Sequence, residues 1–239
     1  MELTGLTALV TGAGQRIGAA CIQALADKGV RIACHANHSW QSAQGQCDDI
    51  RRQGGTAELF VADLAQEEAS QRLFEQVTER MGGVQILVNN AAIFQRGTLL
   101  DLQPSQWQRM MAINLTAPML LMQSFARQGQ AGTIVNVLDQ RIARPRPGHL
   151  AYTVAKSALW TLTQMAALEL APAIRVNAIA PGPILPAMGD SDAAFQRVVA
   201  ATPLQRAGSP QDVVQALLFL LQQPFITGQL LFVDGGEHL

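Results

Sequence analysis

The fold is decided near the start of the chain by residues 7–18, which read TALVTGAGQRIG. Residues 7–10 are an apolar run of the length of a buried strand, and a helix-length stretch begins at Ile17. The glycines between them let backbone N–H groups approach a pyrophosphate at the positive end of that helix. The spacing is not the GxGxxG of common dinucleotide folds, so the turn alone fits a dinucleotide site and a simple tight turn equally well.

Strand-like and helix-like segments alternate along the rest of the chain. We expect strands at residues 7–10, 30–34, 57–62, 84–88, 133–137, 174–179 and 230–233. Helix-length segments lie between them, at residues 17–28, 41–52, 66–81, 104–127 and 150–170. Apolar strands separated by helices indicate a parallel sheet covered on both faces. The sequence therefore predicts one α/β domain over residues 1–239, a doubly wound Rossmann-type fold with a seven-stranded parallel sheet in the order 3-2-1-4-5-6-7.

One segment breaks the alternation. Residues 181–203 are rich in Pro, Gly, Ala and Met and show only weak periodicity. A stretch of this length without clear structure inside a compact domain is often a lid or a binding loop. We expect a substrate-binding loop at about residues 183–203.

Composition and charge exclude several classes of protein. Hydrophobic residues make up 49% of the chain and charged residues 15%, and 17 Lys and Arg nearly balance 18 Asp and Glu. This balance gives no electrostatic attraction to nucleic acid or to anionic membranes. The apolar runs are shorter than the ~18 residues of a membrane span, and the N-terminus lacks the pattern of a secretion signal. The three cysteines show no CxxC spacing, which argues against disulfides and zinc. We expect a cytoplasmic protein without a metal.

Further motifs follow the predicted strands. Asn89-Asn90-Ala91 comes after the fourth strand, Asn114 lies in the next helix, and residues 152–156 read YTVAK. Pro181-Gly182 follows the sixth strand. Together with residues 11–18, these motifs occur in the order TGxxxxxG, NNA, Asn, YxxxK and PG. In this order the chain resembles the short-chain dehydrogenase/reductase family over essentially its whole length.

The resemblance implies a nicotinamide dinucleotide cofactor. It places the cofactor against the first turn, the ends of the second and third strands, and the later motifs. The residues expected to hold the cofactor are Gly12, Gly14, Arg16, Ile17, Gly18, His38, Ser39, Asp63, Leu64, Asn90, Ala91, Tyr152, Lys156, Pro181 and Gly182.

The end of the second strand indicates NADPH rather than NADH. Folds that select NAD usually place a carboxylate there, against the ribose 2′-hydroxyl. Residues 35–39 read HANHS and contain none. Arg16 places a cation where a 2′-phosphate would lie, Ser39 can donate a hydrogen bond, and His38 adds charge when protonated. His35 and His38 also fit ordinary surface residues at a strand end, and this is our interpretation of His35.

Tyr152 and Lys156 are the expected catalytic pair. They are four residues apart and share one helix face. An ammonium beside a phenol lowers the pKa of the phenol, so Tyr152 would donate a proton while Lys156 tunes it and binds the ribose. The family resemblance implies the same roles and assigns Asn114 to a water in the proton relay. Tyr152 is the only tyrosine in the chain.

Asp139 stands where most of the family carries a Ser, thirteen residues before the Tyr. A carboxylate would oppose the negative charge that develops when a ketone is reduced. Reduction of a C=N bond instead needs a proton on nitrogen, which a carboxyl group helps to supply. Asp139 therefore favours an imine-containing ring, unless it is a relic in a protein that has lost its activity.

The pteridine reductases, with dihydromonapterin reductases as neighbours, form the branch that this chain resembles. The resemblance rests on Asp139, on Arg16, and on His35 and Ser39 near the end of the second strand. It maps Phe94 onto the aromatic residue that stacks on the pterin, although a simple pocket wall is the alternative. Two positions depart from the branch: Ala92 replaces a Ser, and His38 replaces an Arg. These departures leave affinity and substrate identity open.

The expected function is therefore NADPH-dependent reduction of a pteridine, from the dihydro to the tetrahydro level, with dihydrofolate as a further candidate substrate. Asp139, Tyr152, Lys156 and Asn114 would be catalytic, and Phe94, Asp139 and Tyr152 would contact the substrate. The alternatives are a carbonyl reductase of 3-oxoacyl or small ketone substrates and a protein that senses NADP(H) without turnover.

Two further expectations concern binding partners. Arg141, Arg144 and Arg146 lie in the loop before Tyr152, where they would attract an acidic substrate tail or carrier protein, or simply be solvated. Family members commonly pair through two long helices, which correspond here to residues 104–127 and 150–170. The resemblance thus implies a homo-oligomer, either a dimer or a tetramer.

Overall fold

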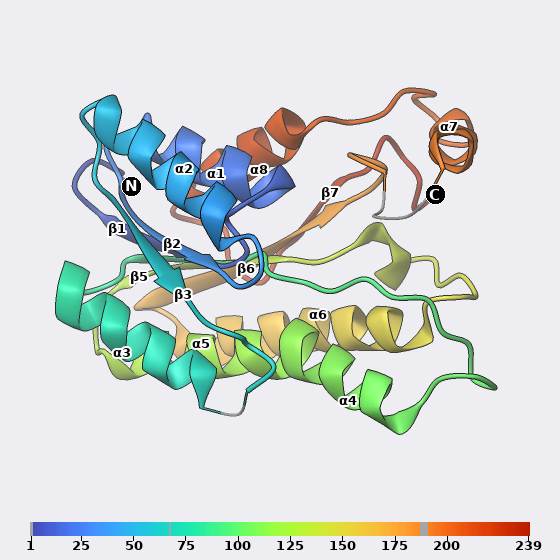
Figure 1. The fold of residues 1–239 in the computed structure, drawn as a ribbon, viewed down its shortest axis with the longest axis horizontal. Helices are drawn as coiled ribbons and strands as arrows, with labels where there is room; N and C mark the ends of the chain where they lie inside the picture. The colour runs from blue at the N-terminus through green and yellow to red at the C-terminus, as the bar shows by residue number, and fades with distance from the viewer. Residues whose placement is uncertain (1, 67, 187–190) are drawn as a thin grey trace.

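A computed structural model describes residues 2–66, 68–186 and 191–239. Its seven parallel strands form one sheet in the order β3-β2-β1-β4-β5-β6-β7 (Figure 1). The strands are β1 Thr7–Val10, β2 Arg31–Ala36, β3 Ala57–Val61, β4 Ile86–Asn89, β5 Gly132–Val137, β6 Ile174–Pro181 and β7 Leu230–Val233. The predicted fold class and strand order are confirmed.

Two layers of helices cover the sheet (Figure 1). On one face lie α1 Arg16–Ala26, α2 Trp40–Arg52 and α8 Pro210–Gln222; on the other lie α3 Ala69–Met81, α5 Ala117–Arg127 and α6 Leu150–Leu170. Successive side chains of one strand enter opposite layers. Ala8 and Val10 of β1 pack in the core beneath α1, α2 and α8, whereas Leu9 packs in the other core. Both faces of the central strands β1 and β4 are buried, which explains their apolar sequences, whereas the edge strands β3 and β7 are only partly buried.

The helix expected over residues 104–127 is interrupted. It consists of α4 Pro104–Met111, a π-helical segment η1 Ala112–Thr116, and α5. Pro118 has no N–H, so it cannot donate to the carbonyl of Asn114 as residue 118 would in a regular α-helix. Such π segments often occur at functional sites. Asn114 therefore lies in a π turn, not in a uniform α-helix.

The expected loop at 183–203 contains a helix, α7 Asp192–Ala200. The Ser191 side chain caps it by accepting a hydrogen bond from the N–H of Ala194. Residues 187–190 of the expected loop, and residue 67 of the expected helix at 66–81, lie outside the described residues. Helix α8 was not predicted, although Ser209 and Asp212 form a capping box at its start. In the described part of the chain, no helix is both long and apolar enough to cross a membrane.

Candidate active site

The predicted site residues collect at the edge of the sheet where the parallel strands end. Residues 11–18 follow β1, His38 and Ser39 follow β2, Asp63 and Leu64 follow β3, and Asn90 and Ala91 follow β4. Asp139 follows β5, and Pro181 ends β6. In open α/β sheets, ligands bind beyond the carboxyl ends of the strands. The fold thus brings the predicted cofactor and catalytic residues to a single edge.

The first turn passes very close to the loop after β4. Gly12 has a φ of +64°, and a Cβ atom there would lie 2.8 Å from the Cα of Ala91. The Asn90 side chain donates to the carbonyls of Thr11 and Gly12 at 2.9 and 3.0 Å. Asn90 therefore ties the ends of β1 and β4 together. The N-cap residue of α1, Gln15, contributes no side-chain hydrogen bond, which leaves the helix N-terminus without a side-chain cap.

His35 is not the surface residue that we expected. It is buried, and its Nδ1 accepts a hydrogen bond from the N–H of Gly12 at 3.3 Å. Because Nδ1 is the acceptor, Nε2 carries the proton and donates to the carbonyl of Ala62 at 3.1 Å. Burial lowers the pKa of His35 to about 4. A neutral imidazole thus joins the glycine turn to the end of β3, a contact that the position of His35 near a strand end did not reveal.

Arg16 and Ser39 lie on either side of the turn. Arg16 is exposed, has a φ of +56°, and donates from its guanidinium to the carbonyl of Leu185 at 3.2 Å. It therefore links the turn to the start of the 183–203 segment. A Cβ atom on Gly14 would lie 2.6 Å from Oγ of Ser39, so Ser39 sits directly against the turn. His38 is exposed beside it.

Tyr152, Asp139 and Lys156 form the centre of the site. The Tyr152 hydroxyl donates to Oδ2 of Asp139 at 3.0 Å, and Oδ1 of Asp139 accepts from the N–H of Arg141 at 2.8 Å. Lys156 is buried and donates from Nζ to the carbonyl of Val137 at 2.6 Å. The three side chains come from the end of β5 and the first turns of α6. Tyr152 and Lys156 share a helix face, as their spacing predicts.

The electrostatics of this centre differ from our expectation. The pKa of Tyr152 is raised well above its usual value, by burial and by the neighbouring Asp139 carboxylate, rather than lowered by Lys156. Lys156 Nζ lies 5.9 Å from the centre of the Tyr152 ring and is bonded to the backbone. Burial also raises the pKa of Asp139 and lowers that of Lys156 to about 8. Tyr152 therefore keeps its proton at neutral pH and can act as a donor.

Asn114 supports the loop after β4. Its side chain is buried; Oδ1 accepts from the N–H of Ile93 at 3.0 Å, and Nδ2 donates to the Ile93 carbonyl at 2.9 Å. The Asn114 amide is therefore engaged with the backbone just before Phe94. Its own carbonyl cannot accept a hydrogen bond from residue 118, because Pro118 has no N–H.

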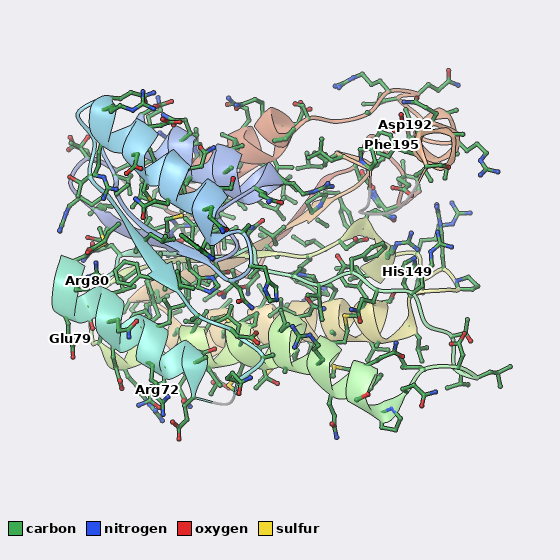
Figure 2. The ribbon with its side chains drawn as sticks, viewed as in Figure 1. Arg72, Glu79, Arg80, His149, Asp192 and Phe195 are labelled. Carbon is green, nitrogen blue, oxygen red and sulfur yellow. The ribbon has the colours of Figure 1, made fainter. Side chains whose placement is uncertain are left out.

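Phe94 lies beside Tyr152 and is 38% exposed. Its ring meets Tyr152 edge-on at 4.7 Å between centroids and stacks on His149 at 4.0 Å, with the two planes 14° apart. The guanidinium of Arg141 lies 5.7 Å from the Phe94 ring centre. Figure 2 places His149 on the same side of the molecule as Asp192 and Phe195 of α7. His149 was missed in the sequence, because nothing in its spacing marks it as a partner of Phe94.

The three arginines before Tyr152 have different surroundings. Arg141 lies over Phe94, Arg144 is exposed, and Arg146 forms an ion pair with Glu237 at 3.0 Å. Of these three arginines, only Arg144 is the solvated loop side chain that one of our two interpretations predicts. Glu237, which the sequence did not single out, comes from the segment after β7.

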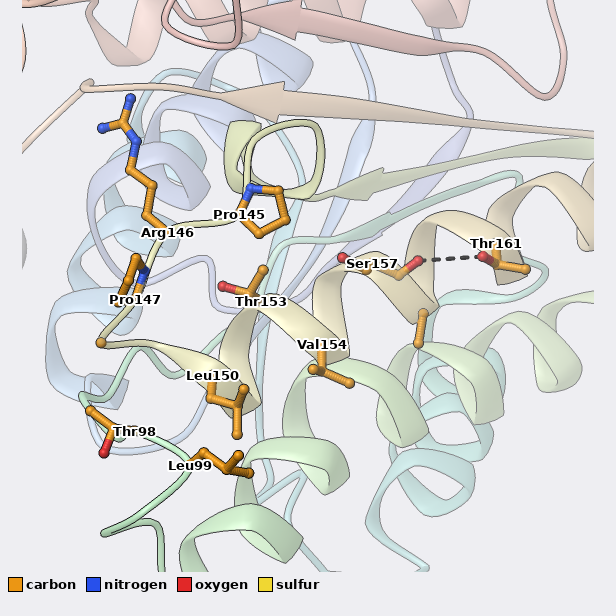
Figure 3. Close-up of a pocket in the computed structure, with 12 residues that line it drawn as sticks. Thr98, Leu99, Pro145, Arg146, Pro147, Leu150, Thr153, Val154, Ser157 and Thr161 are labelled. Atoms are coloured by element: carbon orange, nitrogen blue, oxygen red, sulfur yellow. Dashed lines mark hydrogen bonds between the residues drawn. The ribbon is translucent and has the colours of Figure 1, made fainter.

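A pocket lies between the first half of α6 and the loops at residues 98–99 and 145–148. It has a volume of about 620 Å³ and is lined mostly by apolar side chains, including Leu99, Leu150 and Val154 (Figure 3). Its lining does not include Tyr152, Asp139 or Lys156. Among residues 2–66, 68–186 and 191–239, no group of three or more His, Cys, Asp or Glu side chains could hold a metal ion.

Comparisons with known proteins cover nearly the whole chain. A family model described as enoyl-(acyl carrier protein) reductase matches residues 12–238. The chain is 36% identical to FolM alternative dihydrofolate reductase 1 from Brucella canis, solved in complex with NADP. That match covers 99% of this chain and 95% of the other, with a TM-score of 0.95.

Two other relatives are similar at nearly the same level. A 3-oxoacyl-[acyl-carrier-protein] reductase from Synechocystis sp. is 32% identical, over 98% of this chain and 97% of the relative. The structure of a short-chain dehydrogenase/reductase from Serratia marcescens is 30% identical over the full length of both chains, with a TM-score of 0.95.

Proposed function

Because the chain belongs to the short-chain dehydrogenase/reductase family, a family of oxidoreductases, we propose that it reduces a pteridine ring with NADPH. The substrate would be a dihydropterin, with dihydrofolate as a further candidate, and it would be reduced to the tetrahydro level at a ring C=N bond. The observation that carries the proposal is the 3.0 Å hydrogen bond between Tyr152 and Asp139, which places a carboxyl group next to the proton donor.

The residues around the first turn fit NADPH. The N-terminus of α1 has no side-chain cap and can bind a pyrophosphate through its N–H groups. No carboxylate occurs in residues 35–39, so nothing there would repel a 2′-phosphate, and Ser39 and Arg16 flank the turn. The NADP bound to the Brucella canis relative supports the same choice. Gly12, Gly14, Arg16, Ile17, Gly18, His38, Ser39, Asp63, Leu64, Asn90, Ala91, Pro181 and Gly182 would hold the cofactor, together with Tyr152 and Lys156.

NADPH, when bound, supplies the hydride for the ring carbon. The protein supplies the proton for the ring nitrogen. Tyr152 holds its proton at neutral pH and is placed to donate it. Loss of that proton would leave a phenolate beside the Asp139 carboxylate, so a proton would have to return to this pair. Burial raises the pKa of Asp139, which makes proton uptake by its carboxyl group easier than at an exposed aspartate. The positive charge of Lys156 stabilises this centre, and Asn114 would bind the water that returns protons from solvent.

Phe94 would hold the substrate ring. The side chain is 38% exposed, and its ring contacts Tyr152, which brings an aromatic surface to the proton donor. A planar heterocycle stacks favourably on such a surface. Stacking would position the C=N bond of a pteridine beside the Tyr152 hydroxyl.

Reduction of a 3-oxoacyl thioester is the second candidate, favoured by the identity to 3-oxoacyl-[acyl-carrier-protein] reductases. Asp139 opposes it, because a carboxylate bonded to Tyr152 would face the negative charge of a reduced ketone. The exposed Arg144 is compatible with an acidic carrier protein.

The proposal is tested by following NADPH oxidation by the purified protein with two panels of substrates. One panel contains dihydrobiopterin, dihydromonapterin and dihydrofolate; the other contains an acetoacetyl thioester and simple ketones. We expect turnover of at least one pteridine with a kcat/KM above that for every carbonyl compound. Turnover of the thioester alone would replace the proposal by the second candidate. Binding of NADPH without any turnover would indicate a sensor.

The same proposal includes a homo-oligomer. Val154, Met165 and Leu168 on α6 and Trp107 on α4 leave 39, 48, 76 and 37% of their surfaces exposed. Pairing of these helices with a second copy would cover them. Analytical ultracentrifugation should give a dimer or a tetramer, and Leu168→Glu should lower the assembly state. A monomer in the wild type would contradict this part of the proposal.

A further inference from the structure

The segment after β7, residues 234–239, folds into a compact turn built around Asp234. Oδ1 of Asp234 accepts from the N–H of Gly236 at 3.0 Å, and Oδ2 accepts from the N–H and from the ring of His238, both at 2.8 Å. The His238 ring stacks on Phe232 of β7 at 3.9 Å. These contacts give the C-terminal turn a defined shape.

The C-terminal turn packs against the end of β6 and the end of the 183–203 segment. A Cβ atom on Gly182 would lie 2.6 Å from the Cβ of Asp234, and one on Gly236 would lie 2.8 Å from Cγ of Pro203. The N–H of Leu204 donates to the carbonyl of Gly235 at 3.1 Å. The turn is therefore held beside two segments that the proposed function assigns to the site.

Glu237 of the C-terminal turn contacts the loop between Asp139 and Tyr152. Its side chain is 5% exposed, and Oε1 accepts from Nη1 of Arg146 at 3.0 Å. Arg146 belongs to the loop between Asp139 and Tyr152. Burial and the nearby Asp139 carboxylate raise the pKa of Glu237, so the two carboxyl groups lie within electrostatic reach of each other.

One oxygen of the Glu237 carboxylate accepts no hydrogen bond from the described part of the protein. Arg146 donates to Oε1, and none of these residues donates to Oε2. Oε2 is not among the buried polar atoms that lack a partner, so water or a ligand can reach it. A ligand that brings N–H groups to this edge would bind Oε2 in place of water.

We propose that Glu237 is a substrate-binding residue that recognises the N–H edge of a 2-amino-4-oxopyrimidine ring. That edge carries a ring N–H beside an exocyclic amino group, so it can donate two parallel hydrogen bonds to one carboxylate, as a guanidinium does. Oε1 can accept from both Arg146 and the substrate, because each carboxylate oxygen has two acceptor positions. The assignment rests on the proposed pteridine reduction and names the part of the ring that gives specificity.

The test compares two substrates in NADPH-loaded wild type and Glu237→Gln. One substrate is a 2-amino-4-oxo dihydropteridine; the other is the matching 2,4-dioxo dihydropteridine, in which a carbonyl replaces the amino group. Hydrogen bonds to a charged group contribute about 1.5–3 kcal/mol, which corresponds to roughly 10- to 100-fold in binding. We expect Glu237→Gln to raise KM for the amino substrate by that factor, with kcat changed less, and to leave kcat/KM for the dioxo substrate within about threefold.

Controls separate recognition from folding. Glu79→Gln changes an exposed glutamate on α3, far from the site in Figure 2, and should leave both substrates unaffected. NADPH binding to Glu237→Gln, measured by fluorescence, reports whether the site is intact. Glu237→Asp keeps the charge on a shorter side chain and should recover part of the preference for the amino substrate.

The outcomes are distinct. In one outcome, wild type reduces the amino substrate, but Glu237→Gln lowers kcat/KM equally for both substrates or leaves both unchanged. Glu237 then does not recognise the amino edge, while the proposed pteridine reduction stands. If wild type reduces neither substrate while it binds NADPH, the proposed function and this assignment fail together.

Discussion

The hydroxyl of Tyr152 is bonded to Oδ2 of Asp139, and Oδ1 of the same carboxyl group is held by the backbone N–H of Arg141. Both oxygens are thereby fixed, so the carboxyl group cannot turn away from the phenol. A serine at position 139 has a shorter side chain with a single oxygen, so it could not hold the phenol and the backbone N–H through two separate atoms. The aspartate thus sets the orientation of Tyr152 and places a carboxyl group beside its hydroxyl.

Asp139→Ser tests whether this carboxyl group matters for the type of reaction. We expect turnover of a dihydropterin to fall on the order of 10²-fold, the scale of a lost acid–base contribution. Activity on a ketone should hold or rise, because the opposing carboxylate is gone. Steady-state kinetics on both substrates measures the change, and an equal loss on both would show that Asp139 is only structural.

The raised pKa of Asp139 also predicts a pH dependence. If the protonated acid passes its proton to Tyr152, kcat for the pteridine should fall as the pH rises above the pKa of Asp139. The Asp139→Ser variant should lack that limb of the profile. A profile with the same limb in both proteins would assign it to another group.

Tyr152→Phe removes the proton donor and keeps the ring that packs against Phe94. Steady-state reduction should be lost to the limit of detection, while the dissociation constant for NADPH changes less than about threefold, because the hydroxyl contributes mainly to chemistry. Isothermal titration alongside the activity assay separates the two effects. Residual reduction within tenfold of wild type would remove Tyr152 from its proposed role.

Arg16 tests the choice of cofactor. Arg16→Glu places a negative charge near the expected 2′-phosphate and should weaken NADPH binding by about 10- to 100-fold, as expected for a lost charge-assisted hydrogen bond, with little effect on NADH. Arg16→Gly is the matched control for backbone effects, because glycine adopts the φ of +56° without strain. It should lose selectivity without losing thermal stability. Equal effects on the two cofactors would contradict the assignment.

His35 predicts how stability depends on pH. Its pKa is about 4 in the folded protein, below the ~6.5 of an unfolded chain. Between these values the unfolded state binds more protons, so the free energy of unfolding falls as the pH drops from 6.5 to 4, by about 3 kcal/mol. His35→Asn keeps an acceptor for Gly12 without a titrating ring and should flatten this slope in urea unfolding. Parallel slopes in the two proteins would show that other groups cause the loss.

Phe94 tests the stacking of the substrate. Phe94→Leu keeps an apolar side chain but removes the ring, and should raise KM for a dihydropterin about tenfold, within the range that stacking on an aromatic side chain contributes. Phe94→Tyr is the matched control and should stay close to wild type. An unchanged KM in Phe94→Leu would make Phe94 a wall of the pocket, as the alternative interpretation holds.

The strands and the shared helix face of Tyr152 and Lys156 could be predicted because their signals are local. Apolar runs mark the buried parallel strands, and the four-residue spacing puts Tyr152 and Lys156 on one helix face. The raised pKa of Tyr152 could not be predicted, because it depends on burial and on the Asp139 carboxylate beside the hydroxyl. The contacts of His35 and Glu237 were missed because their partners are distant in sequence and lie in loops.

Some structure was missed although a signal was present. Ser209, Pro210 and Asp212 mark the start of α8, and Ser191 marks the start of α7. Pro118 marks the break in the long helix, since a proline there removes one regular hydrogen bond. These signals are single residues that cap or interrupt a helix. An analysis based on apolar periodicity alone does not detect them.

The most direct test of the pteridine assignment is the fate of a labelled hydride. Dihydrobiopterin and an acetoacetyl thioester are supplied in equal amounts to the enzyme together with deuterated NADPH. Two experiments are run, each with the deuterium at one of the two C4 positions of the nicotinamide. The products are analysed by mass spectrometry and NMR. With one of the two labels, we predict a tetrahydropterin that carries a single deuterium on the carbon of the former C=N bond, formed faster than the hydroxyacyl product. Recovery of unchanged dihydropterin beside a deuterated hydroxyacyl thioester would contradict the account.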